Sequence, residues 1–149
     1  MRKTALLCAS LFFGLLCVFN VAKAQTQNVQ VTITGIKSDK GQILLNVYKD
    51  QETFSKDKPF KKIMVAKKLL SDGSTIVEIP LEPGTYGITL LDDENSNGDM
   101  DKNMVGMPKE GFGFSNFFLE KMKRPTFDDF KIQVATSQQN KAEIKAKYM

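Results

Sequence analysis

Apolar and polar residues alternate through most of the chain beyond residue 25. In the clearest example, Val29, Val31 and Ile33 are separated by Gln30 and Thr32. A period of two places the apolar side chains on one face of a β-strand and the polar ones on the other. The same pattern returns in six later segments, at 43–47, 63–65, 77–81, 86–90, 130–134 and 144–148. We therefore predict an all-β domain of about seven strands.

Short glycine-containing segments separate several of these strands. They are Asp39-Lys40-Gly41, Ser71-Asp72-Gly73 and Glu82-Pro83-Gly84. Glycine adopts the positive φ that many tight turns need. Tight turns join antiparallel neighbours, and no segment keeps a helical period over three turns. We predict an antiparallel Greek-key β-sandwich, with residues 25–149 as one domain and one long loop after the fifth strand.

Residues 1–24 have the organisation of a secretory signal peptide. Arg2 and Lys3 precede an apolar run at 5–21, and Ala22-Lys23-Ala24 supplies small residues at the two positions that a signal peptidase reads. We expect cleavage after Ala24 and export to the periplasm, the outer envelope or the medium. The alternative is an uncleaved membrane anchor, although the run is at the short limit for a span. No second apolar run follows, so the mature chain has no predicted transmembrane segment.

The composition of the mature chain excludes several functions. Removing three basic residues and no acidic ones lowers the formal net charge from +4 to +1, which leaves no basic surface suited to nucleic acid. Both cysteines, Cys8 and Cys17, lie in the signal peptide, and the chain has no histidine. Histidine-dependent nucleophilic catalysis and thiolate or imidazole zinc sites are therefore excluded. We expect a monomeric protein that is not an enzyme.

The most distinctive motif lies in the long connection from 92 to 127, where residues 93–101 read D-x-N-x-N-G-x-x-D. Oxygen-bearing side chains at alternate positions before a glycine allow the backbone to curl around a hard cation. Asp99 would contribute its backbone carbonyl, and Gly98 would make the sharp bend. We predict one calcium ion bound by Asp93, Asn95, Asn97, Asp99 and Asp101.

This loop differs from a helix–loop–helix calcium site. Met104 stands where such a site has a bidentate glutamate, and the preceding segment is a predicted strand. A missing ligand would come from Asn103, from Glu110 or from water. With fewer charged ligands, we expect weak affinity, about 10⁻⁴ to 10⁻³ M. The alternative is an Asn- and Asp-rich surface turn that binds no ion.

A second candidate site follows in the same connection. Phe112 and Phe114, with Ser115 and Asn116, would form a surface for a partner. The alternative is that the aromatic rings form a small core under the connection, with Ser115 and Asn116 satisfying backbone groups.

Two lysine pairs, Lys61-Lys62 and Lys67-Lys68, flank the predicted strand at 63–65. Lysines beside an edge strand discourage pairing with other chains. We expect both pairs to be solvated and to protect a sheet edge, and we assign them no binding role.

Two motifs resemble known families. Leu81-Glu82-Pro83-Gly84-Thr85-Tyr86 resembles transthyretin-like (prealbumin-like) sandwiches. The acidic loop, followed by G-x-P-x-E-x-x-G-F-S-N at 106–116, is similar to an exported bacterial family, domain of unknown function 2141. The resemblance implies export and a small all-β domain, and it implies no activity.

The sequence thus predicts an exported, non-catalytic module that binds one structural calcium ion and presents a surface to a protein partner or a glycan. One alternative is a purely structural envelope protein without an ion. A less favoured alternative is a hydrolase that uses two carboxylates. The acidic residues are concentrated in one turn, where like charges favour a cation over paired catalytic roles.

Overall fold

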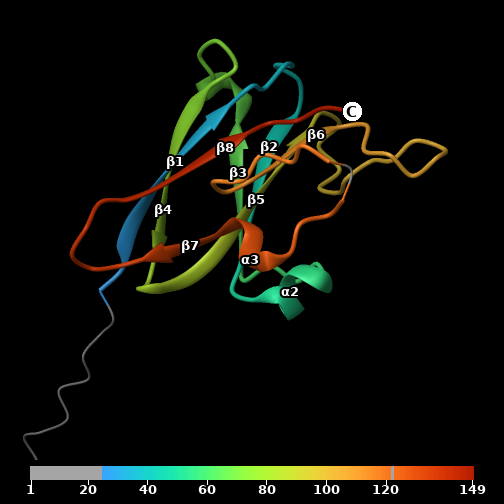
Figure 1. Ribbon diagram of the computed structural model, residues 1–149. Helices are drawn as coiled ribbons and strands as arrows, with labels where there is room; N and C mark the ends of the chain where they lie inside the picture. Colours follow the sequence, from blue (N-terminus) through green and yellow to red (C-terminus); the bar gives the residue numbers. More distant parts are fainter. Residues whose placement is uncertain (1–24, 122) are drawn as a thin grey trace, which may run out of the picture.

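The computed structural model describes residues 25–121 and 123–149, so the predicted signal peptide lies outside the described residues. The described chain forms two β-sheets (Figure 1). One sheet has the order β4-β1-β8; the other has the order β3-β2-β5-β6, with β7 also paired to β5. The strands are β1 (Gln27–Thr34), β2 (Gln42–Tyr48), β3 (Lys61–Ala66), β4 (Thr75–Leu81), β5 (Gly84–Asp93), β6 (Gly111–Phe114), β7 (Lys131–Val134) and β8 (Asn140–Lys145).

The hydrophobic core lies between the two sheets. Val29, Val31 and Ile33 of β1 are fully buried, as are Ile43 and Leu45 of β2 in the facing sheet. The polar residues between them point away from this core, as the period of two predicts. The prediction of an all-β domain is confirmed in this two-layer form.

The prediction of a wholly antiparallel arrangement is wrong at one place. Strands β1 and β8 pair in parallel, with Val29 opposite Asn140 and Thr34 opposite Lys145. Tight turns fix the relative direction only of strands that follow one another in sequence. Because β8 reaches β1 from the far end of the chain, no such turn determines its direction. The other paired strands run antiparallel.

The structure also contains a strand that the alternation did not reveal. Strand β6 lies within the connection predicted as one long loop, and it is only four residues long. It pairs with residues 89–92 of β5, whereas β7 pairs with residues 84–87 of the same strand. The two short strands therefore occupy one edge of β5, one after the other.

Two short helices and a 3₁₀ turn connect the strands: α2 (Gln51–Ser55), η1 (Lys67–Leu69) and α3 (Phe127–Phe130). The Asp50 carboxylate caps α2 by accepting a 2.7 Å hydrogen bond from the Thr53 N–H, which lowers the pKa of Asp50. The helices bury Phe54, Phe127 and Phe130 against Tyr48 in a second, aromatic core. No helix among the described residues has the length and apolar character needed to cross a membrane.

Candidate metal centre

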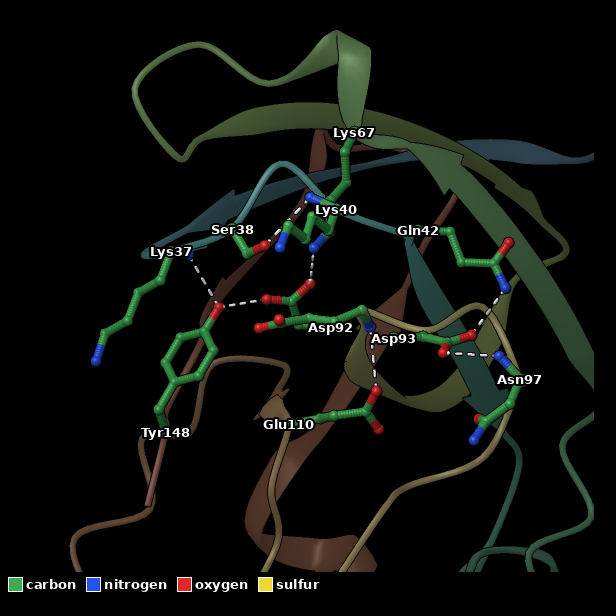
Figure 2. Close-up of polar contacts among 11 residues, drawn as sticks. Lys37, Ser38, Lys40, Gln42, Lys67, Asp92, Asp93, Asn97, Glu110 and Tyr148 are labelled. Carbon is green, nitrogen blue, oxygen red and sulfur yellow. Dashed lines mark hydrogen bonds and ion pairs between the residues drawn. The ribbon is translucent and has the colours of Figure 1, made fainter.

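The predicted calcium loop begins at the last residue of β5, in the connection that leads to β6, and a later part of this connection extends beyond the two sheets (Figure 1). Asp93 is fully buried. One carboxylate oxygen accepts the Asn97 N–H at 3.0 Å, and the other accepts the Gly98 N–H at 2.9 Å and the Gln42 amide at 2.8 Å (Figure 2). Asp93 therefore holds the turn against the sheet through its side chain.

Asn95, Asn97 and Asp101 form the centre of the loop. The side-chain nitrogens of Asn95 and Asn97 donate to the two oxygens of Asp101, at 2.6 and 3.2 Å. Their side-chain oxygens accept the N–H groups of Asn97 and Asp99, at 3.0 and 2.8 Å. Apart from the exposed Asp99 side chain, the predicted ligands are joined in one hydrogen-bonded network.

Glu110 closes this loop from the far end of the connection. Its side chain is buried, and its two oxygens accept the N–H groups of Glu94 and Asp101, each at 3.1 Å. The Lys109 N–H also donates to the Asp101 carbonyl at 2.8 Å. A carboxylate that bridges both sides of the loop brings the 94–101 turn back onto the sheet. The sequence placed Glu110 among the alternatives for a missing ligand, and the structure places it beside the loop.

The loop residues fit a weak calcium site in kind. Their side chains offer carboxylate and amide oxygens, which are the ligands calcium takes in proteins. The carboxylate of Asp93 already accepts three hydrogen bonds, so about one of its four lone-pair positions remains. The described residues contain no group of three or more carboxylate, histidine or cysteine side chains arranged for a metal. To bind a cation here, the side-chain amides of Asn95 and Asn97 would have to rotate, so that their oxygens face Asp101 where their nitrogens now do.

Sequence reasoning missed a buried ion pair beside this loop. Asp92 points to the opposite side of β5 from Asp93 (Figure 2). It is fully buried, forms an ion pair with Lys67, and accepts a 2.5 Å hydrogen bond from the Tyr148 hydroxyl. The Tyr148 oxygen in turn accepts the Lys37 N–H at 3.0 Å. Burial, together with the bond to Asp92, raises the pKa of Tyr148.

Lys67 therefore corrects the expectation that both lysine pairs are solvated, since only 5% of Lys67 is exposed. The alternation contained the signal that identifies it. Lys67 continues the inward series of Ile63 and Val65, just as Asp92 continues that of Ile88 and Leu90. Two opposite charges on inward positions of the same sheet predict a buried pair.

The residues of the second candidate site mostly pack into the fold and bond to its backbone. Phe112 is buried, and the half-buried Phe114 ring lies 5.3 Å from that of Phe130. The fully buried Ser115 hydroxyl accepts the Ile88 N–H at 3.0 Å and donates to the Phe130 carbonyl at 2.6 Å. Its own N–H donates to the Ile88 carbonyl at 2.8 Å. Ser115 thus links the end of β6 to β5 and to Phe130, the last residue of α3, directly before β7.

Asn116 makes a similar connection to the other sheet. Its backbone N–H donates to the Glu143 carbonyl, and its side-chain oxygen accepts the Glu143 N–H, both at 2.8 Å. These two bonds imitate the pairing of a further strand beside β8. The sequence F-S-N at 114–116 therefore joins the two sheets at this end of the molecule.

Comparisons with known proteins give one positive result. No curated protein and no solved structure matches the chain. The model of a bacterial family, described as "Uncharacterized protein conserved in bacteria (DUF2141)", matches residues 31–142. The matched region runs from β1 into β8 and includes the acidic loop and the segment at 106–116. The chain belongs to this uncharacterized bacterial family.

Proposed function

We propose that this protein is an exported, non-catalytic β-sandwich module that binds one calcium ion in the loop between β5 and β6. The bound ion would fix the loop that stands beside the outer face of the five-stranded sheet, and this face would receive a protein partner or a glycan. The sequence features behind the export proposal are the basic start, the apolar run and the Ala22-Lys23-Ala24 site.

The observation that carries the calcium proposal is the convergence of Asp93, Asn95, Asn97 and Asp101 in one network. These side chains are the alternate-position oxygen donors of the sequence motif. Asp93 and Asp101 supply two negative charges, which is few for a tight calcium site. We therefore propose affinity in the range of extracellular modules, about 10⁻⁴ to 10⁻³ M.

Thermal melting in the presence of calcium tests this proposal. An ion that binds only the folded state stabilises it by about 1.4 kcal/mol at ten times its Kd. For a domain of this size, the melting temperature should rise by a few degrees. Asp101→Asn, which removes a ligand charge, should abolish the rise. Asp99→Asn is the matched control and should retain it, because Asp99 is proposed to bind through its backbone carbonyl.

A second candidate function is a structural envelope protein whose loop needs no ion. One specific observation favours it: the loop is already closed by its own hydrogen bonds. They include the two bonds that the Glu110 carboxylate accepts from the N–H groups of Glu94 and Asp101, here called the clasp. In that case, the melting temperature would be the same with and without calcium, and Asp101→Asn would alter the melting temperature equally in both conditions.

The proposed architecture is a transthyretin-like sandwich with Greek-key connections and a mixed sheet. The strand orders β4-β1-β8 and β3-β2-β5-β6 support it, as does the Pro83-Gly84 turn between β4 and β5. An experimental structure of residues 25–149 tests this proposal through the connections between the two sheets.

A further inference from the structure

A cleft of about 360 Å³ lies on the outer face of the five-stranded sheet. This volume is within the range of sites for small ligands. One wall comes from the long connection, and Phe54, Asp57 and Arg124 lie at the opposite side. The wall residues are Gly98, Asp99, Met100, Lys102 and Pro108. Its floor is the face of β2, β5 and β6 that points away from the main core.

Strand register arranges the floor in two rows. Asn46 lies opposite Lys62 of β3 on one side and Thr89 of β5 on the other, and Thr89 lies opposite Phe114 of β6. This row is mostly polar. The next row is apolar, with Leu91 of β5 opposite Phe112 of β6. A ligand in the cleft would therefore meet hydrogen-bonding groups beside an apolar surface.

The polar groups of the cleft favour a ligand that carries hydroxyl groups. The side-chain oxygen of Asn46 is buried and has no hydrogen-bond partner among the described residues. An unpaired polar atom is costly, and rotation of the amide toward a ligand donor would remove this cost. The Tyr48 hydroxyl, two residues further along β2, donates to Asp57 at 2.6 Å, so a phenol and a carboxylate are held side by side next to this row.

The charged and aromatic groups that line the cleft restrict the chemical class of the ligand further. Carboxylates of Asp57 and Asp99 accompany the cations of Lys62, Lys102 and Arg124, so the field does not select a polyanion. Arg124 stacks 4.4 Å from the centre of the Phe54 ring and donates to the Phe54 carbonyl at 3.0 Å. Hydrogen-bonding groups and charges of both signs beside the half-buried Phe114 ring suit a sugar ring, which has polar edges and apolar faces.

We propose that this cleft binds a saccharide of one or two rings, with Asn46, Thr89 and Phe114 as the main contacts. The inference rests on the proposed function in one respect, since it names the ligand of the surface beside the loop. The cleft itself is formed by residues of the protein and needs no ion for its shape.

The test is a titration of the ¹⁵N-labelled protein with cellobiose and with N,N′-diacetylchitobiose, followed by NMR. We expect saturable shifts of the backbone amides at 46–48, 89–91 and 113–114 with at least one of these probes. Asn46→Leu should weaken binding by about tenfold or more, as expected for one lost hydrogen bond. Asn28→Leu is the matched control, because Asn28 is an exposed residue of β1 on the other sheet, and it should leave the affinity unchanged.

Several results would overturn this inference. These are the absence of saturable shifts with both disaccharides, shifts confined to Phe118 and Lys145 outside the cleft, and equal affinity of Asn46→Leu and Asn28→Leu. Saturable binding of laurate in the cleft with no binding of either disaccharide would also overturn it, in favour of an apolar ligand.

The saccharide proposal and the calcium proposal can be contradicted independently of each other. Asn46→Leu should keep the rise in melting temperature with calcium, since Asn46 is not a loop residue. If calcium did not raise the melting temperature of the unaltered protein but disaccharides still bound, the calcium proposal would be wrong and the saccharide proposal would stand. A calcium-dependent rise without disaccharide binding would remove only the saccharide site.

Discussion

Lys67 and Lys68 are adjacent lysines with opposite surroundings. Lys67 is buried in an ion pair with Asp92, whereas Lys68 is exposed. In the sequence, their charge does not distinguish them. Their place in the alternation does, because Lys67 continues the inward series of Ile63 and Val65 and Lys68 does not. At this scale, a residue's role depends on the side of the sheet that it faces.

Lys67→Met should therefore destabilise the protein strongly. Removing one partner leaves the Asp92 carboxylate buried without its counter-charge, which costs about 3–5 kcal/mol. Lys68→Met should change the free energy of unfolding by less than about 0.5 kcal/mol. Urea unfolding of the two variants measures the difference. Equal effects of the two substitutions would show that the buried pair has been assigned wrongly.

Tyr148 gives the protein a pH dependence in the alkaline range. Its pKa in the folded protein is raised above the ordinary value of 10.0. The unfolded chain therefore loses this proton first, and the free energy of unfolding falls as the pH rises above that value. Tyr148→Phe removes this contribution, so its stability should fall less steeply between about pH 9 and 11. Parallel slopes for the two proteins would contradict the assignment.

The elements around the long connection depend on individual side chains, because they are too short to be stable alone. Strands β6 and β7 have four residues each and share one edge of β5. Between them, Ser115 bonds to Ile88 of β5 and to Phe130, directly before β7. Glu110 then holds the loop before β6 by bonds to two backbone N–H groups. These contacts make the connection an ordered part of the sheet edge.

Glu110→Ala should loosen the loop while leaving the two sheets folded. The amide protons of Glu94 and Asp101 lose their acceptor and should exchange with solvent faster, and the protein should lose about 1–3 kcal/mol of stability. Lys109→Ala is the neighbouring control, because the Lys109 side chain is exposed. Unchanged exchange at Glu94 and Asp101 in Glu110→Ala would contradict the role of the clasp.

Much of this fold follows from alternation, and the remainder depends on contacts distant in sequence. The inward positions Val29, Ile43 and Ile88 were predictable, since each continues a period of two. Strand β6 was not, because Phe112 and Phe114 give too few repeats to separate a strand from a loop. The parallel pairing of β8 with β1 and the clasp of Glu110 likewise arise from tertiary contacts that no local pattern encodes. The cleft could not be predicted from the sequence, because β2, β5, β6 and the loop form it together.

At the scale of the whole molecule, the described residues form two sheets around one main core, and we propose that residues 1–24 direct the export of this domain. The core between the sheets contains no thiol, so folding needs no disulfide in an oxidising compartment. Expression of the full chain in a bacterial host should yield a mature protein that begins at Gln25. Intact-mass measurement of the exported protein tests this, and retention of residues 1–24 would instead indicate an uncleaved anchor.

The most direct measurement for the central claim is a high-resolution crystal structure of residues 25–149 grown in calcium. The calcium proposal predicts anomalous density for one ion in the 93–101 loop, with oxygens of Asp93, Asn95, Asn97 and Asp101 at about 2.3–2.6 Å. It also predicts that the amide nitrogens of Asn95 and Asn97 no longer donate to Asp101. Density for water alone, with both amide nitrogens still bonded to Asp101, would contradict the claim.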